Sequence, residues 1–107
     1  MSSASETARV VLCTAPSGDV ARELARTLVG EGLAACANLV PGVVSIYRWQ
    51  GEVEEDAEVL LVLKAPAARL EALERRLLEL HPYDTPELVA LAPEHVEARY
   101  LDWLLKG

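Results

Sequence analysis

The feature that most limits the fold of this sequence is the order in which strand-like and helix-like apolar patterns follow one another. Continuous or two-residue apolar patterns, typical of strands, occur at residues 8–14, 33–49, 58–64 and 87–92. Apolar residues at helical spacing separate the first two and the last two of these runs, at 18–30 and 66–80. A further helical pattern covers 96–104. The predicted order is therefore βαββαβ followed by a C-terminal helix.

This order is that of the split βαβ, or ferredoxin-like, arrangement, in which two helices cover one face of an antiparallel four-stranded sheet. It predicts an α+β fold in a single domain at 8–107, because 107 residues is an ordinary size for one domain, with a flexible tail at 1–7. The second sheet face would keep apolar residues without a helix above them. Such a patch usually marks a partner surface, so we expect self-association.

Two turn signals divide the middle of the chain. Pro41-Gly42 either ends one strand and begins another or forms a bulge within one long strand. Gln50-Gly51 predicts the tip of a β-hairpin. Residues 52–56, which follow this tip, are so acidic that we expect them to be exposed to solvent.

The charge of the chain excludes some classes of partner. The formal net charge is -7 and the acidic residues are dispersed, which argues against nucleic acid as a ligand. No apolar run approaches the roughly 20 residues that span a bilayer, and the first seven residues lack the pattern of a signal peptide. We therefore expect a cytoplasmic protein without membrane insertion. An acidic surface concentrates cations, so it permits a metal-binding role.

Few residues in the chain suit catalysis or tight metal coordination. The sequence has no phosphate-binding glycine loop, no H-E-x-x-H and no nucleophile elbow, so we expect no enzyme. Its two cysteines, Cys13 and Cys36, fit buried core thiols, although Cys13 could also bind a metal. His81 closes a predicted helix beside a rigid proline loop, and either caps that helix or acts as a ligand or acid/base. His95 fits a solvated surface position.

Five blocks of sequence carry a family resemblance. They are LAACAN at 33–38, SIYRWQG at 45–51, Glu58 with Leu63-Lys64, HPYDTPE at 81–87 and YLDW at 100–103. In this order and with these gaps they resemble the CutA family of divalent-cation tolerance proteins, over about residues 9 to 105. The resemblance implies a ferredoxin-like protomer in a homotrimer built like the PII signalling regulators, with a long central hairpin that adds strands across subunits.

The resemblance also implies a metal role. The family is associated with tolerance of copper and other divalent cations, and a copper role would transfer to Cys13 and His81 by matching positions. Some members carry a second histidine where this chain has Leu80. The expected function is thus a homotrimer that binds copper or another divalent cation weakly and serves metal tolerance or homeostasis.

A second group of polar and aromatic residues suggests a cleft between subunits. Glu58 and Lys64 share a strand face but lie about 20 Å apart along an extended strand, so they cannot pair with each other in one chain. We expect them to line an intersubunit cleft together with Trp49, Tyr83, Asp84 and Glu87. Alternatively, these residues are interface ion pairs and anchors that hold the assembly together.

Two rival functions follow from these alternatives. In the first, the protein is a PII-like regulator that binds a small anionic metabolite in the cleft and signals to an unidentified protein partner. In the second, it is an assembly scaffold whose metal binding is incidental.

Overall fold

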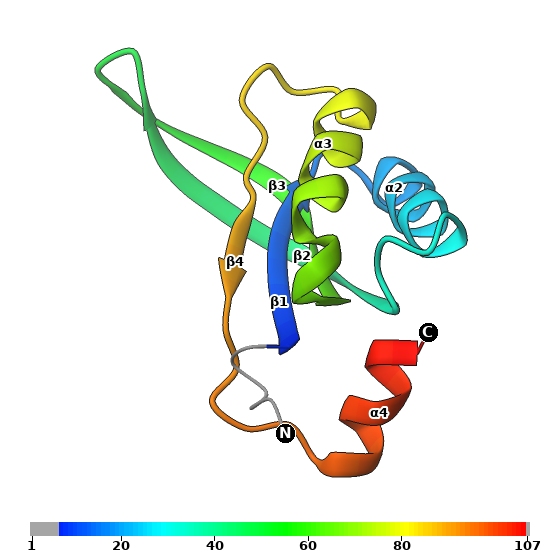
Figure 1. Cartoon of the computed structure of the whole chain (residues 1–107). Coiled ribbons are helices and arrows are strands. Elements are labelled where there is room, and N and C mark those ends of the chain that lie inside the picture. The colour runs from blue at the N-terminus through cyan, green and yellow to red at the C-terminus, as the bar shows by residue number, and fades with distance from the viewer. Residues whose placement is uncertain (1–6, 107) are drawn as a thin grey trace.

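The computed structural model describes residues 7–106, and of the predicted N-terminal tail residues 1–6 lie outside this range (Figure 1). The elements, in chain order, are β1 (Ala8–Ala15), α2 (Gly18–Gly30), β2 (Cys36–Trp49), β3 (Glu52–Pro66), the 3₁₀ turn η1 (Ala67–Arg69), α3 (Leu70–Leu80), β4 (Val89–Leu91) and α4 (Ala98–Lys106). The predicted order βαββαβ with a terminal helix is confirmed. The last strand is shorter than the expected 87–92, and Glu87 precedes it.

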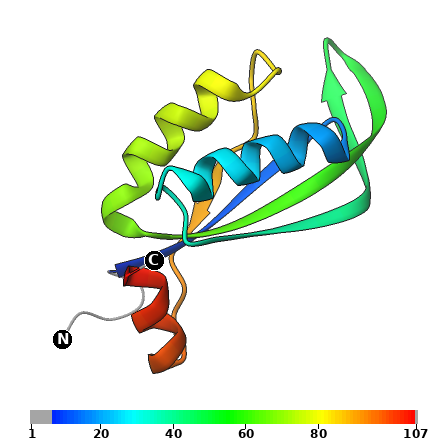
Figure 2. The ribbon, with the colours of Figure 1, turned by 90° about the vertical axis from the view of Figure 1, so that its right-hand side faces the viewer.

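The four strands form one sheet in the order β2-β3-β1-β4, and every neighbouring pair is antiparallel. Helices α2 and α3 lie together on one face of this sheet (Figure 2). This is the α+β, ferredoxin-like arrangement that the pattern predicts. Helix α2 connects β1 to β2, and helix α3 connects β3 to β4. In the sheet, β1 lies between β3 and β4, although the three strands are distant in sequence.

The core forms where one face of the sheet meets the apolar stripes of the two helices. Along β3 the two-residue period sends Leu61 and Leu63 to this face, where both are fully buried. The helices contribute Leu28 from α2 and Leu73 and Leu77 from α3, which are also fully buried. Burial of each such leucine contributes about 1.5–3 kcal/mol, so this layer stabilises the sheet and the helices together.

The ends of the helices follow local chemistry. The side chain of Ser17 accepts a hydrogen bond of 3.2 Å from the amide of Val20, so Ser17 caps α2. The predicted helical run 66–80 is wrong at its first residue, Pro66. It ends β3 with an extended ψ of 140°, and η1 intervenes before α3 begins at Leu70.

The hairpin of β2 and β3 is long and projects away from the body of the molecule (Figure 1). Pro41-Gly42 forms a bulge inside one strand, because the register shifts between Val40 and Val43 while β2 continues. At the tip, Gln50 and Gly51 have φ values of 50° and 83°, and two successive positive φ values are typical of a type I′ turn. Both turn signals therefore lie inside one two-stranded arm.

Helix α4 lies on the side of the sheet opposite to α2 and α3 (Figure 2). It packs against β1 and β3 and buries Leu104, while the rings of Tyr100 and Trp103 lie 5.5 Å apart and stay largely exposed. The expectation that this face carries no helix is thus wrong at one end, and elsewhere Val40, Val89 and other apolar residues remain exposed. Within residues 7–106, no helix is both long and apolar enough to cross a membrane.

Candidate ligand-binding cleft

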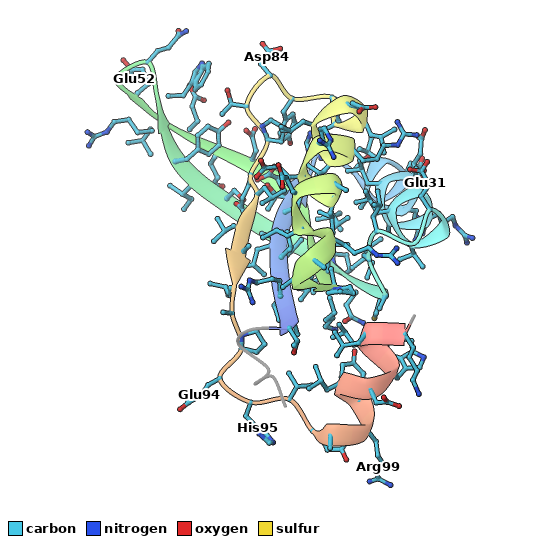
Figure 3. All side chains as sticks on the ribbon, in the orientation of Figure 1. Glu31, Glu52, Asp84, Glu94, His95 and Arg99 are labelled. Carbon is cyan, nitrogen blue, oxygen red and sulfur yellow. The ribbon has the colours of Figure 1, made fainter. Side chains whose placement is uncertain are left out.

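A cavity of about 450 Å³ lies where the hairpin arm leaves the sheet. Its walls come from the end of β1, from facing positions on β2 and β3, and from the loop between α3 and β4. The lining residues are Thr14, Tyr47, Trp49, Asp56, Glu58, Tyr83, Asp84, Thr85 and Glu87. In Figure 3, the labelled Asp84 of this loop lies at the same end of the molecule as Glu52, near the hairpin tip. We call this cavity the cleft.

Tyr83 joins the loop to the sheet. Its hydroxyl donates a hydrogen bond of 2.8 Å to the carboxylate of Glu58, on the strand β3. Burial, and then the hydrogen bond and charge of Glu58, raise the pKa of the Tyr83 phenol, because ionisation would place a second anion beside the carboxylate. Tyr83 therefore remains a neutral donor, and Glu58 has one of its oxygens occupied.

A second tyrosine repeats this arrangement on the hairpin arm. The hydroxyl of Tyr47, on β2, donates to the carboxylate of Asp56, on β3. This hydrogen bond raises the pKa of Tyr47 to about 12. In the strand register Tyr47 faces Glu54 and Ser45 faces Asp56, so all four side chains share one sheet face. Two phenols, one from β2 and one from the loop, are thus held by two carboxylates of β3.

His81 fastens the base of the loop to β1. Its Nδ1 accepts a hydrogen bond of 3.1 Å from the amide of Tyr83, so Nε2 carries the ring hydrogen and donates a hydrogen bond of 2.8 Å to the carbonyl of Thr14. The residue is only 7% exposed, and its ring lies 4.7 Å from that of Tyr83. Both ring nitrogens therefore have partners within the chain, and a metal ion would have to displace one of them.

Cys13 lies on the helix-covered face of β1 and is fully buried. Its thiol lies 3.6 Å from the carbonyl oxygen of Thr14, which also accepts the hydrogen bond from His81. Burial, and then the charges of Glu87 and Glu58, raise the pKa of Cys13 to about 12. The thiol is the protonated form, whereas a metal ligand is a thiolate.

The two residues of the predicted metal site thus meet at one carbonyl oxygen. Across the described part of the chain, no group of three or more His, Cys, Asp or Glu residues is placed to hold a metal ion. The assignment of Cys13 and His81 as metal ligands stays a prediction.

The other cysteine and histidine differ in their environment. Cys36 was expected in the core, but it is half-buried on the opposite sheet face, where it pairs in register with Lys64. The bulge after Val40 is the reason, because it sets which residues of β2 point to the helices. His95 is exposed at the end of the molecule far from Asp84, as its sequence context predicts (Figure 3).

Five of the six predicted cleft residues line the cavity, namely Trp49, Glu58, Tyr83, Asp84 and Glu87. Lys64 does not, because it lies further along β3, where its ammonium group donates to the side-chain oxygen of Asn38. As expected, Glu58 and Lys64 do not pair with each other. Their partners, Tyr83 and Asn38, come from the same chain.

The sequence interpretation missed four lining residues, Thr14, Tyr47, Asp56 and Thr85. A signal existed for two of them. Counting back from the Gln50-Gly51 turn puts Tyr47 and Asp56 on one face of the arm. Thr14 and Thr85 carry no such signal, since only the fold of the loop brings them here.

The cleft carries negative charge without a counter-charge. Four of its lining residues have carboxylates, and among the described residues that line it there is no Lys, Arg or His. The salt bridges within residues 7–106 all lie elsewhere, for example between Arg76 and Glu31 at 2.9 Å. Uncompensated carboxylates around an accessible cavity attract cations and repel anions.

The chain has close relatives among known proteins. The family model described as "CutA1 divalent ion tolerance protein" matches residues 9–106. The divalent-cation tolerance protein CutA of Thermus thermophilus is 55% identical over 95 residues, which is 89% of this chain and 92% of that protein. A solved structure of the divalent cation tolerance protein Cut A1 from the same organism superposes with a TM-score of 0.90 at 52% identity, covering 92% of this chain and 96% of that one.

A more distant solved structure has the same fold. It is described as the periplasmic divalent cation tolerance protein CutA from Archaeoglobus fulgidus, and it is 28% identical with a TM-score of 0.89, covering 92% of this chain and 96% of that one. The fold is therefore retained at low identity.

Proposed function

Because this chain belongs to the CutA1 family of divalent-cation tolerance proteins, we propose that it is a homotrimeric protein that binds copper or another divalent cation and serves metal tolerance. The observation that carries this proposal is the uncompensated negative charge of the cleft. Carboxylate oxygens are ligands that many divalent cations accept. The role is one of binding rather than catalysis, in the cytoplasm.

The geometry of a single chain supports an assembly. A metal site needs several ligands that converge on one point, and the described residues of one chain provide no group of three. A second subunit that lies against the cleft would supply the missing ligands. The exposed apolar residues Val44, Ile46 and Val53 on the hairpin arm also need a cover, being 61%, 65% and 73% exposed. A PII-like trimer meets both requirements.

The charge of the cleft favours this function over the rival PII-like regulator of an anionic metabolite. An anion would enter a cavity lined by four carboxylates, including Asp56 and Glu58, and the described lining offers no cationic side chain to receive it. A regulator of that kind would require cationic side chains from another subunit. The scaffold with incidental metal binding predicts no saturable binding at all.

Sedimentation and calorimetry test the proposal together. We expect three times the protomer mass in sedimentation equilibrium at micromolar concentration. We expect copper titrated into the protein to give a saturable heat. A stable lone protomer, or the absence of saturable heat with copper, zinc and magnesium, would refute the proposal.

Variants locate the metal. If Cys13 and His81 are the ligands, Cys13→Ser and His81→Ala abolish the heat, whereas Asp56→Asn combined with Glu58→Gln leaves it intact. If the cleft carboxylates are the ligands, the pattern is reversed. Each variant is first checked for an unchanged mass and a cooperative unfolding transition, since His81 also fastens the loop.

A further inference from the structure

Three aromatic side chains share the cleft with the four carboxylates. Tyr47 and Trp49 are two residues apart on β2, so they point to the same face of the arm, and they are 42% and 56% exposed. Tyr83 belongs to the opposite wall, in the loop after α3. A cavity with aromatic surface and several carboxylates suits a ligand that combines positive charge with an apolar body.

The carboxylates are dispersed rather than gathered at one point. Asp56 and Glu58 are two residues apart along β3, and each already accepts a hydrogen bond from a tyrosine hydroxyl. Asp84 and Glu87 belong to the loop, on the other side of the cavity. In one chain they leave room for a larger cation, because a bare metal ion needs ligands within about 2.0–2.6 Å of one centre and would take the missing ones from a second subunit. A space of about 450 Å³ instead has the size of a small organic molecule.

The aromatic rings add an attraction that is specific to organic cations. The face of a tryptophan or tyrosine ring is negative, and it attracts ammonium and guanidinium groups within about 6 Å of its centre. The hydrogen bonds from Tyr47 and Tyr83 to Asp56 and Glu58 hold these two rings in place before any ligand arrives. The ligand therefore finds aromatic rings that are already ordered, which lowers the entropic cost of binding.

We propose that the cleft binds a small organic cation, namely an ammonium or guanidinium group carried on an apolar body. Glu58, Asp84 and Glu87 pair with its charge, and Trp49 and Tyr47 pack against its body. This inference rests on the cleft of the proposed function and adds a second class of cation to it.

A matched series of probes tests the ligand class. The chain has two tryptophans, and Trp103→Phe leaves Trp49 as the reporter of the cleft. Hexylammonium, hexanol and hexanoate share one apolar body and differ in charge. In buffer freed of metal, we expect hexylammonium to change the Trp49 fluorescence saturably and more weakly at high salt. We expect no saturable change with hexanol or hexanoate.

Variants locate the binding. Asp84→Asn, at an exposed position, should weaken hexylammonium binding about tenfold, as should Glu58→Gln. Trp49→Ala should weaken it about fivefold in calorimetry. Glu71→Gln, an exposed carboxamide substitution on α3, is the matched control and should leave the affinity unchanged. Asp84→Asn keeps the test valid if Glu58→Gln loosens the loop.

Three outcomes would overturn the inference: no saturable binding of hexylammonium, equal binding of hexylammonium and hexanol, or an affinity that Asp84→Asn and Trp49→Ala leave unchanged. Copper titrated in parallel separates the two proposals. Saturable copper binding without hexylammonium binding leaves the metal function standing and removes this inference. The reverse result removes the metal function and leaves the organic cation.

Discussion

The imidazole Nε2 of His81 donates a hydrogen bond to the carbonyl of Thr14, and the thiol of Cys13 approaches the same oxygen. The His81 bond is 2.8 Å long and buried, and it connects the end of α3 to the end of β1. Because the loop after His81 forms one wall of the cleft, this single carbonyl links the core of the sheet to the candidate site.

Removing the imidazole should destabilise the protein. In His81→Ala the buried carbonyl of Thr14 loses its imidazole donor, and the amide of Tyr83 loses its acceptor. We expect a loss of about 1–3 kcal/mol in the free energy of unfolding, measured by urea denaturation. His95→Ala, at an exposed position, is the control and should change little. Equal stability of the two variants would contradict the structural role of His81.

The two cysteines should differ in reactivity. Cys13 is fully buried and its pKa is raised to about 12, so a thiol reagent at neutral pH should not modify it in the folded protein. In a Cys36→Ala variant, we expect labelling only after denaturation, followed by mass spectrometry. Rapid labelling of the folded variant would show that Cys13 is accessible.

The ionisation of Tyr47 should report on its hydrogen bond to Asp56 in the hairpin arm. The pKa of Tyr47 is raised to about 12 by its hydrogen bond to Asp56, above the ordinary value of 10.0. The fold favours the neutral phenol. The contribution of its hydrogen bond to the stability of the folded protein is therefore fully present below about pH 10 and is lost as the pH rises through about 12. Ultraviolet titration of phenolate should show this late ionisation in the wild type.

Two variants assign that ionisation. Tyr47→Phe should remove it from the titration, and Asp56→Asn should return it toward the ordinary range. If Asp56→Asn left the titration unchanged, the hydrogen bond would not be its cause.

The hairpin tip should be sensitive to a side chain at one glycine. Gly51 has a φ of 83°, so Gly51→Ala should cost about 1–2 kcal/mol in the free energy of unfolding, measured by thermal denaturation. Gly30 ends α2, and apart from its chain neighbours and the backbone of its own helix no described heavy atom lies within 4 Å of the position of an added Cβ. Gly30→Ala is therefore the control and should be neutral or stabilising. A larger loss for Gly30→Ala would contradict the assigned backbone geometry.

Features that depend on neighbours in the chain could be predicted well. The tip at Gln50-Gly51 and the face that Glu58 shares with Lys64 on β3 each follow from local chemistry or from the two-residue period. Trp49 and Glu58 could also be assigned to a cleft, because polar and aromatic residues on one strand face need partners. Cys36 could not be placed, since the bulge after Val40 changes which side of β2 faces the helices.

By itself, the sequence determined the order of the elements, the alternation of side chains along β3 and the excess of negative charge, because periodicity, turn chemistry and composition are properties of the chain alone. Only the tertiary structure decided that His81 binds Thr14 with one ring nitrogen and Tyr83 with the other, and that Lys64 pairs with Asn38 away from the cleft. The reason is physical. Such contacts join residues far apart in sequence, and packing of the whole core brings them within hydrogen-bonding distance.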